Sequence, residues 1–389
     1  MQHPTAEQRA LHDSATRFLA QQCDFARHRR RQQEPDAGFD RALWTRMGEL
    51  GWLGVMVSEA AGGLGQAPRA ALAIIEAMGG QFVSEPYPQA LAAAQLLQAL
   101  GSAGQQQRWL PGLCEGSVLM LPAHAEPGAR DEVACVQTRA HAVAGGYRLD
   151  GRKSALPWGQ AADAWLVSAR TSGALDSTDG VALFIVPRDA AGLRLERHEG
   201  MAGEPVADLV LDGVTVPADA LLGPAGGAFA ALDAAQAFLL AAACAEAVGT
   251  LEAVVQSTRD YARTRRQFGA PLSSFQVIAH RLVDMFTQVQ LARSMAQLAA
   301  RRLDEWDASP QQQQQQQLSL SACKAQVSAA CRFVGEQAIQ IHGGIGMTDE
   351  LALSHQVRRL LAIERHLGDR FHHLGILTER VMQGAGLYA

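Results

Sequence analysis

The sequence predicts a mainly α-helical protein with a β domain in the middle of the chain. Over roughly residues 4–118, apolar residues recur at the three- and four-residue spacing of a helix. Between about 119 and 222, short apolar runs alternate with Gly and Asp, and long helical patterns return after Gly227. We therefore predict an N-terminal helical domain at 1–118, an antiparallel β domain at 119–225 and a C-terminal four-helix bundle at 226–389.

The N-terminal helical domain opens with a capping signal. Thr5 and Gln8 have the spacing of a capping box, in which each side chain bonds the other residue's backbone amide. Further along, glycine and proline interrupt the apolar period and indicate turns. The pattern predicts helices at Arg69–Met78 and Tyr87–Leu100, with turns at Gly62–Gly65 and Pro111–Gly112.

The middle domain is predicted from short runs of β-forming residues. Dipeptides that favour tight hairpins lie between these runs, at Gly145–Gly146, Asp150–Gly151 and Asp212–Gly213. The predicted strands include Tyr147–Leu149, Ala164–Val167, Val181–Val186 and Leu209–Leu211.

The C-terminal domain is predicted from its unusually long helical patterns. One runs from about Phe229 to Phe268 without proline, and another covers Gln276–Trp306. Such lengths are typical of helix bundles. The seven glutamines of Gln311–Gln317 lie between helical patterns and form either a solvated loop or an extension of a helix.

Composition and charge narrow the classes of function. The chain has 34 Lys and Arg against 39 Asp and Glu, and no pervasive basic stripe, so we expect no nucleic-acid partner. We interpret the basic run Arg27–Arg31 as a solvated helix end. We find no uncharged apolar segment of roughly eighteen to twenty residues, so we expect no membrane span. Charged residues throughout Met1–Leu19 argue against a signal peptide, so we expect a cytoplasmic location.

Common catalytic and metal-binding signatures are missing from the sequence. The six cysteines form no Cys-x-x-Cys pair or zinc spacing, so we interpret them as buried free thiols and expect no metal. The sequence has no Gly-x-Ser-x-Gly, His-Glu-x-x-His or P-loop motif. No Gly-x-Gly-x-x-Gly follows a predicted strand, which disfavours a Rossmann dehydrogenase.

Two segments of the C-terminal domain stand out. In Tyr261–Gln276, a helix ends among arginines, turns at Gly269–Pro271 and restarts. Arginines there can hold a pyrophosphate, although at a helix C-terminus they more often complement the helix dipole. In Gln340–Glu350, paired glycines let a backbone approach a ligand, although a plain helix-ending turn is the simpler interpretation. We interpret His342 as a packed or capping histidine rather than a base.

With both segments in this order after a helical and a β domain, the sequence resembles the acyl-CoA dehydrogenase family over nearly its whole length. The remaining motifs of the resemblance are Gly51–Gly54, Ser58–Gly65, Glu126–Ala129 and Ala207–Pro217 with Leu222–Gly223. The resemblance implies an FAD enzyme with the three domains predicted above. It also implies that the two C-terminal segments of one subunit reach the FAD of a neighbour, and hence an oligomer, usually a dimer of dimers. The implied cofactor-binding residues are Arg265, Phe268, Gln276, Gln340, Gly343 and Gly344.

The reaction that the resemblance implies is α,β-dehydrogenation of an acyl-CoA substrate. A carboxylate removes the α-proton while a hydride leaves for the flavin, and electrons then pass to an electron-transfer flavoprotein. Acyl selectivity would depend on the long helix near Ala237–Glu246.

The catalytic base is where the sequence departs from the family. Counting from the motifs, the two positions that carry the family's glutamate are Leu367 and Leu239, and Glu246 lies two turns beyond the second. Asp369 is the candidate base, with a helix cap as its alternative role. Without a base the chain would instead be a non-catalytic subunit that completes a partner's FAD site.

The β domain also departs from the family pattern. Arg130 and Asp131 replace a Gly-Ser pair, and Ala155–Trp158 replaces an aromatic-Ile-Thr run. With these departures, the chain resembles the smaller-subunit branch of the family, which includes pimeloyl-CoA and steroid dehydrogenases of α2β2 assembly. The flavin dock that this subunit would provide for itself is therefore less well defined than the one that it would lend to a neighbour.

Overall fold

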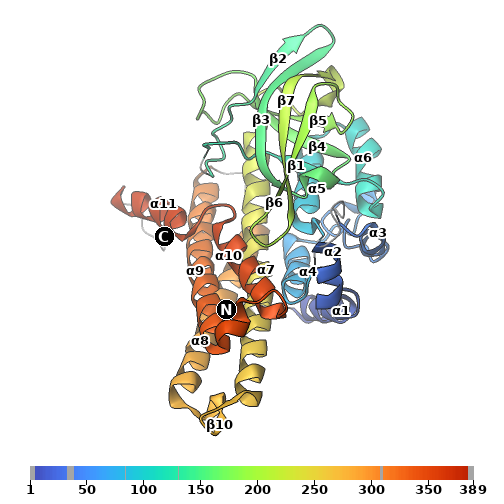
Figure 1. The fold of residues 1–389 in the computed structure, drawn as a ribbon. Coiled ribbons are helices and arrows are strands. Elements are labelled where there is room, and N and C mark those ends of the chain that lie inside the picture. Colours follow the sequence, from blue (N-terminus) through green and yellow to red (C-terminus); the bar gives the residue numbers. More distant parts are fainter. Residues whose placement is uncertain (1–4, 33–38, 84, 130, 307–309, 384–389) are drawn as a thin grey trace. The chain divides into compact units, whose positions relative to one another are not determined.

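The computed structural model describes residues 5–32, 39–83, 85–129, 131–306 and 310–383. The chain divides into two compact units. The first unit comprises Met1–Arg30, Pro68–Val83 and Leu240–Ala389, and the second comprises Arg31–Ala67 and Ser84–Leu239. The predicted fold class, helical with a β domain in the middle, is confirmed (Figure 1).

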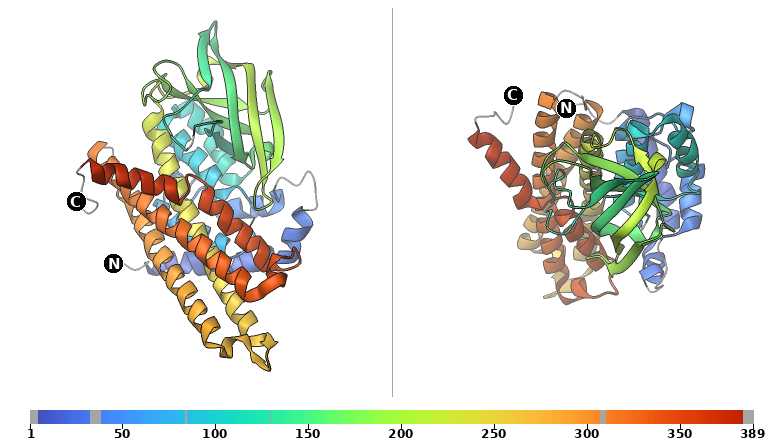
Figure 2. Two further views of the ribbon diagram at one scale, coloured as in Figure 1. Left: turned by 60° about the vertical axis from the view of Figure 1, so that its left-hand side comes forward. Right: turned by 90° about the horizontal axis from the view of Figure 1, so that it is seen from above.

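The first unit is helical. Its helices are α1 (Ala6–Gln22), α2 (Phe25–Gln32), α4 (Pro68–Gly79), α7 (Phe229–Thr264), α8 (Gln276–Asp304), α9 (Pro310–His342), α10 (Ala352–Arg365) and α11 (Arg370–Met382), with α2 and α7 continuing into the second unit. Helices α8 and α9 lie side by side along their length, and α11 packs across α9 (Figure 2).

The core of the bundle is built largely from small apolar side chains of α7, α8, α9 and α10. Ala247, Ala292, Ala330 and Ala338 are all buried there. Small residues at helix contacts let the helix backbones approach one another closely. The long helices of this bundle therefore pack with few large side chains between them. The glutamine tract lies within α9, so its interpretation as a helix extension is confirmed.

Helix α7 is long and apolar. By length and composition it meets the test for a membrane span, contrary to the expectation that no segment would do so. In the structure, 67 % of the apolar window is buried inside the protein. The apolar character of α7 is therefore accounted for by its central place in the packing.

The second unit holds the sheet. Its helices are α3 (Arg41–Glu49), α5 (Tyr87–Leu100) and α6 (Ala103–Glu115). Its strands are β1 (Met120–Ala123), β2 (Arg139–Val143), β3 (Gly146–Pro157), β4 (Ala164–Arg170), β5 (Val181–Pro187), β6 (Leu193–Glu199), β7 (Pro205–Pro217) and β8 (Leu221–Leu222). The order is β6-β7-β3-β2-β4-β5-β8, with β1 on β4. The sheet is mostly antiparallel, but β4 pairs in parallel with both β1 and β2.

Several local predictions are confirmed and others are wrong. Thr5 and Gln8 form the expected capping box, and Gly145 closes the β2–β3 hairpin. The Asp150–Gly151 and Asp212–Gly213 dipeptides do not make hairpins, because they lie inside the long strands β3 and β7 at a bulge. There the Asp150 carboxylate accepts a hydrogen bond from the Gly213 amide at 2.9 Å. Pro111 and Gly112 are likewise inside α6 rather than in a turn.

Candidate active site

The turn between α7 and α8 forms an exposed tip of the bundle. After α7 ends at Thr264, the short strands β9 (Arg266–Gln267) and β10 (Ala270–Pro271) pair and reverse the chain (Figure 1). Phe268 sits in this turn with φ of 52°, and 91 % of its surface is exposed. Arg265 and Gln276, on either side of the turn, are also exposed. The tip therefore presents a guanidinium, an amide and an aromatic ring to the surroundings.

The second predicted segment follows the end of α9. Gly343 has φ of 67° and begins a short 3-10 helix that extends to Met347. A side chain placed on Gly343 or Gly344 would meet nothing within 4 Å, so the backbone here is open to a ligand. Gln340 is exposed one turn earlier. Open backbone amides next to an amide side chain suit the binding of phosphate oxygens.

The structure brings the two segments together. The ring of Tyr261, one helical turn before Arg265, stacks on the ring of His342 with centroids 4.2 Å apart. The Tyr261 hydroxyl donates to the His342 carbonyl at 3.4 Å. His342 is buried and contacts the Ala338 carbonyl through Nδ1 at 2.9 Å, which confirms its interpretation as a packed residue. Burial lowers the pKa of His342.

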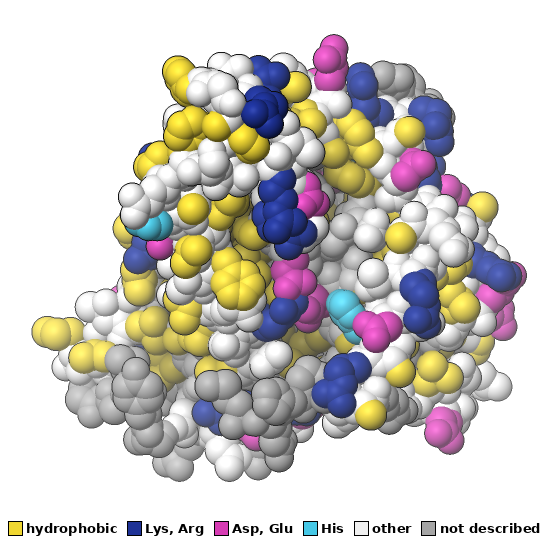
Figure 3. Space-filling model, turned by 90° about the horizontal axis from the view of Figure 1, so that it is seen from below, with side chains coloured by type: hydrophobic (Ala, Val, Ile, Leu, Met, Phe, Trp, Pro, Cys, Tyr) yellow, Lys and Arg dark blue, Asp and Glu magenta, His cyan; other side chains and the backbone are white. Residues whose placement is uncertain are grey.

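On the face of the molecule shown in Figure 3, basic side chains lie close to acidic ones and among apolar ones. Charge on this face is thus mixed rather than gathered into one basic surface. A charged ligand that meets this face would therefore contact individual charged side chains rather than a large area of one sign.

The turn at Leu367, one of the two positions where the family carries its glutamate, is held by several hydrogen bonds. Leu367 and Gly368 both have positive φ, of 58° and 90°. The buried Lys324 ammonium donates to the Gly368 carbonyl at 2.9 Å and to the Glu364 carbonyl at 3.0 Å. His373 contacts the Leu367 carbonyl through Nε2 at 2.9 Å. These hydrogen bonds fix the backbone of the turn. The Leu367 side chain, however, cannot take a proton.

Asp369 caps helix α11. Its carboxylate accepts a hydrogen bond from the His372 backbone amide at 2.9 Å. That hydrogen bond lowers the pKa of the Asp369 carboxyl, so the group is ionised at neutral pH. The predicted capping role is confirmed, and its role as a base stays a prediction.

Glu246 is held by an arginine that no sequence motif indicates. Both carboxylate oxygens of Glu246 accept from Arg359, at 2.6 Å and 2.7 Å. Nearby, burial and the charges of Arg359 and Lys324 lower the pKa of His366 to about 4. Neither Arg359 nor Lys324 belongs to a motif, and Arg359 is 113 residues from Glu246 in the sequence. No local pattern could have indicated these contacts.

The Glu126–Ala129 motif of the middle domain anchors strand β3. The Glu126 carboxylate accepts from the backbone amides of Gln137 and Thr138, and from the buried Lys153 ammonium at 2.5 Å. Burial raises the pKa of the Glu126 carboxyl, but Lys153 and Thr138 outweigh it and hold that pKa below its usual value. The glutamate of this motif is thus structural.

The two departures from the family pattern in the β domain differ in what the structure describes. Arg130 lies outside the described residues, while Asp131 has φ of 65°. Trp158 also has a positive φ and only 8 % of its surface is exposed. Its ring is therefore largely used in packing within the sheet unit.

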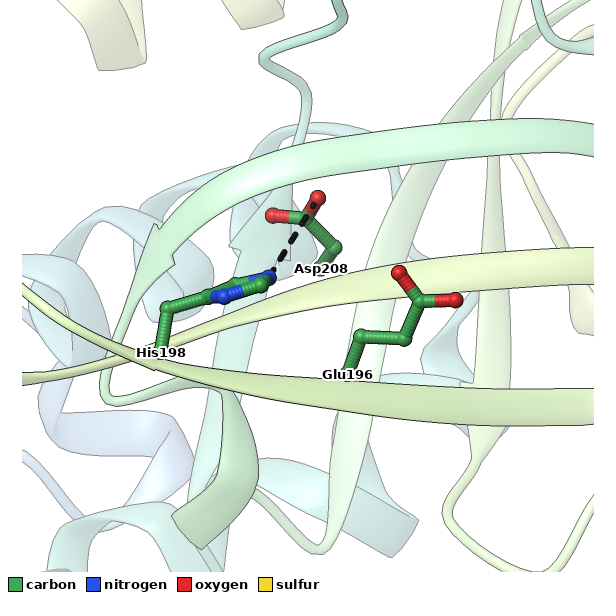
Figure 4. Close-up of side chains that lie close together, drawn as sticks. All are labelled: Glu196, His198 and Asp208. Atoms are coloured by element: carbon green, nitrogen blue, oxygen red, sulfur yellow. Dashed lines mark ion pairs between the residues drawn. The ribbon is translucent and has the colours of Figure 1, made fainter.

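Glu196, His198 and Asp208 form the one group among the described residues that could offer three metal ligands (Figure 4). The ligand atoms lie within 4.8 Å of one another on β6 and β7. However, the Arg152 guanidinium donates to Glu196 at 2.5 Å and to Asp208 at 2.6 Å. Because a side-chain cation already bridges the carboxylates, we do not assign a metal site here.

A groove of about 660 Å³ also lies within the first unit. It is bordered by α1, α4, α7 and α8, with His12, Glu76, Arg259 and Phe286 among its lining residues. None of the residues predicted to bind the cofactor lines it. The groove is therefore separate from the candidate site.

Comparison with known proteins identifies the family to which this chain belongs. Family descriptions of the acyl-CoA dehydrogenase N-terminal, middle and C-terminal domains match residues 5–117, 122–214 and 239–382. The chain belongs to the acyl-CoA dehydrogenase family. It is thus an oxidoreductase of a flavoprotein family whose members act on CH–CH bonds.

Particular relatives cover most of the chain. "Acyl-CoA dehydrogenase FadE12" of Mycobacterium tuberculosis is 30 % identical over 84 % of this chain and 85 % of its own length. "Probable acyl-CoA dehydrogenase YngJ" of Bacillus subtilis is 31 % identical over 82 % of this chain and 84 % of its own. A solved structure of a variant of the Tcur3481-Tcur3483 steroid ACAD is 27 % identical, with a TM-score of 0.85 over 97 % of this chain and 98 % of that one.

Proposed function

We propose that this chain binds FAD and catalyses α,β-dehydrogenation of an acyl-CoA thioester, passing electrons to an electron-transfer flavoprotein. The meeting of the Arg265 and Gly343 segments at one end of the bundle supports this proposal most directly. FAD, when bound, would supply the hydride acceptor. The residues present suit its dinucleotide end, because the two segments that carry a guanidinium, two side-chain amides and open backbone amides are in contact through Tyr261 and His342.

These residues would act by binding and orienting. Arg265 would offer charge-assisted hydrogen bonds to a pyrophosphate, while Gln276 and Gln340 would offer amide donors. Gly343 and Gly344 would offer backbone N–H groups that no side chain covers. Because the α7–α8 turn is an exposed tip, we propose that it serves the FAD of a neighbouring protomer in an oligomer.

Asp369 is our candidate for the base that removes the α-proton. It is ionised at neutral pH, which a base must be. Its capping hydrogen bond stabilises the carboxylate and makes it a weaker base than a free aspartate. The proposal therefore depends on a direct test of that residue.

The experiment is to purify the chain and record its visible spectrum before and after anaerobic addition of a panel of acyl-CoAs. A flavin band that bleaches with acyl-CoA supports the proposed reaction. A colourless chain that becomes yellow only with a co-expressed partner would instead support a non-catalytic subunit. Absence of flavin under both conditions would contradict the proposal.

Arg265→Ala tests the assignment of the cofactor site. We expect this variant to retain less FAD than the wild type, because the guanidinium would no longer pair with the pyrophosphate. Arg259→Ala is a matched control, since Arg259 lies further back on the same helix and pairs with its neighbour Asp260. Unchanged FAD content in Arg265→Ala would count against the assigned site.

We also propose how the chain assembles. The similar steroid ACAD structure is named for two proteins, Tcur3481 and Tcur3483. By analogy, we propose that this chain forms either a homo-oligomer or a pair with a second dehydrogenase chain, and a dimer of dimers is the expected arrangement. Mass measurement of the purified and the co-expressed protein distinguishes the two.

A further inference from the structure

A groove in the helical unit combines an exposed apolar wall with acidic groups. It lies between α1, α4, α7 and α8, and its volume is about 660 Å³. Every residue that lines it belongs to the first unit. Small-molecule sites typically have volumes of roughly 300–1,000 Å³. The groove is therefore large enough for a small organic ligand.

Helix α8 supplies the apolar wall of the groove. Val283 and Phe286, one turn apart, line the groove although 62 % and 56 % of their surfaces are exposed. Leu282 and Val289 line it beside them. Exposed apolar side chains that gather in one place are a feature of ligand-binding grooves. The Phe286 ring can also stack on a flat ring and attract a cation to its face.

Helices α4 and α7 close the floor of the groove. Gly80 and Gly249 line it where these two helices meet. A Cβ atom added to Gly249 would overlap the Glu76 carbonyl, so the two backbones are in direct contact. A ligand can therefore enter the groove from the surface but cannot pass between α4 and α7.

Charge is unbalanced at one end of the groove. The carboxylates of Glu76 and Glu252 both line it, and both pair with the guanidinium of Arg293, which lies 3.3 Å from Glu76 Oε1. Two carboxylates thus share one cation, which leaves one negative charge in excess. Burial raises the pKa of the Glu76 carboxyl against the opposing charges of Arg293 and His12. A further cation would therefore stabilise this pair of carboxylates.

The basic groups that line the groove do not supply that cation. Arg259 pairs with Asp260 at 3.2 Å, and His12 Nδ1 lies 3.5 Å from Asp13 Oδ1. Each of these groups therefore has an acidic neighbour of its own. The excess negative charge makes the groove complementary to a cation rather than to an anion.

We propose that this groove binds an organic cation, a protonated amine attached to a flat apolar ring system. The ammonium group would lie at the carboxylates of Glu76 and Glu252. The rings would pack against Phe286 and Val283. This inference goes beyond the proposed function and does not depend on it, because none of the residues predicted to bind the cofactor lines the groove.

Three probes that share an indole ring and differ in charge test the proposal. Tryptamine carries an ammonium group, tryptophol a hydroxyl and indole-3-propionate a carboxylate. Their binding to the purified full-length chain is measured by calorimetry, with and without added FAD. We expect tryptamine to bind about tenfold more tightly than tryptophol, and indole-3-propionate to bind most weakly. Equal affinities for the three probes, or no binding of tryptamine, would overturn the proposal.

A charge variant tests the acidic end of the groove. Glu252→Gln removes the excess charge and leaves Glu76 paired with Arg293. We expect this variant to bind tryptamine about tenfold more weakly and tryptophol unchanged. The control is Glu336→Gln, which alters an exposed carboxylate of α9 outside the groove. Equal losses of tryptamine affinity in the two variants would contradict the assigned site.

A second variant tests the apolar wall. Phe286→Ala should weaken the binding of both tryptamine and tryptophol by about fivefold, since both place the same ring against Phe286. The control is Leu291→Ala, an exposed apolar position of α8 outside the groove, which should bind both probes as the wild type does. Wild-type affinity in Phe286→Ala would show that the probes bind elsewhere.

The outcomes separate this inference from the proposed function. Tryptamine binding by a chain that takes up no flavin would support the groove site and contradict the proposed reaction. Flavin bleaching by acyl-CoA in a chain that does not bind tryptamine would overturn the groove site alone. If Phe286→Ala lowers the number of chains in the particle, as measured by sedimentation, the apolar wall is covered by a second copy, and the ligand site is overturned.

Discussion

The carboxylate of Asp369 has one role that the structure shows and one that remains a prediction, and a single substitution separates them. Asn caps a helix about as well as Asp, so Asp369→Asn should keep the thermal stability of α11. Asn cannot accept a proton, so flavin reduction by acyl-CoA should slow by orders of magnitude if Asp369 is the base. Stopped-flow bleaching measures this, and a fully active variant would end the assignment.

Arg170 is a second residue whose role can be tested in isolation. Its buried guanidinium donates to backbone carbonyls on both sides of β4, including those of Val136 at 3.1 Å and Asp179 at 2.9 Å. Arg170→Met would leave these carbonyls without their donor. We expect the free energy of unfolding to fall by about 3 kcal/mol.

Urea denaturation measures the effect of Arg170→Met. The matched control is Arg46→Met, because Arg46 is exposed and its ion pair is with Glu49 of the same helix. We expect that control to change stability by less than about 0.5 kcal/mol. Equal losses of stability in the two variants would contradict the stabilising role assigned to the Arg170 hydrogen bonds.

At this scale the sequence was informative only where partners are close along the chain. The Thr5–Gln8 capping box and the packed role of His342 could be predicted, because the first is a contact three residues apart and the second follows from histidine's ordinary behaviour. The contacts of Arg170 and Lys324 could not be predicted. Their acceptors are mostly backbone carbonyls of other segments, and a carbonyl carries no residue-specific signal.

At the scale of elements, the crossing of α4 and α7 depends on glycine. We expect Gly79→Ala to lower the free energy of unfolding by about 2–3 kcal/mol, since its Cβ would overlap the Glu246 carbonyl. Gly375→Ala in α11 is the control, because a Cβ there meets nothing within 4 Å. That control should be neutral or slightly stabilising. A neutral Gly79→Ala would show that the helices can separate at no cost.

The contact between α2 and α10 is sensitive to acid. His28 Nε2 lies 3.3 Å from His355 Nδ1, with Arg27, Arg358 and Asp349 also nearby. Burial, and then the charges of His355 and Arg358, lower the pKa of His28 from 6.5 to about 4. The unfolded chain therefore binds the proton first, and stability falls as the pH drops from 6.5 towards 4.

His28→Phe should reduce that acid sensitivity while keeping the aromatic contact with Phe82. Urea midpoints measured between pH 7 and pH 4 should depend less steeply on pH in this variant. His141→Phe, at an exposed position of β2, is the control. A wild-type slope in His28→Phe would show that the pair does not contribute.

Helices and strands were predicted well where a hydrophobic pattern continues over many residues. They were predicted poorly where the prediction rested on a single dipeptide. The run from Phe229 became α7 almost in full, because about ten turns of consistent pattern outweigh local noise. The predictions for Asp150–Gly151 and Asp212–Gly213 were wrong, because an Asp-Gly pair suits a bulge as well as a hairpin. The turn expected at Pro111 was wrong because a helix held by its neighbours can include a proline.

At the scale of the whole molecule, the order of domains was the strongest predictor of fold. A helical, then β, then helical chain is uncommon, and the family match over all three parts agrees with it. The juxtaposition of the Arg265 and Gly343 segments followed from the same resemblance. The closure of α7 by α4 and the Glu246–Arg359 pair did not, since they depend on packing between distant segments.

We propose that the exposed tip of one protomer binds the FAD of another. Analytical ultracentrifugation of the FAD-loaded chain, followed by flavin absorbance, tests it over a range of protein concentrations. We expect the flavin to sediment only with species of two chains or more, and to be released when dilution yields monomers. A monomer that keeps its full complement of FAD would show that the cofactor does not need a neighbouring protomer.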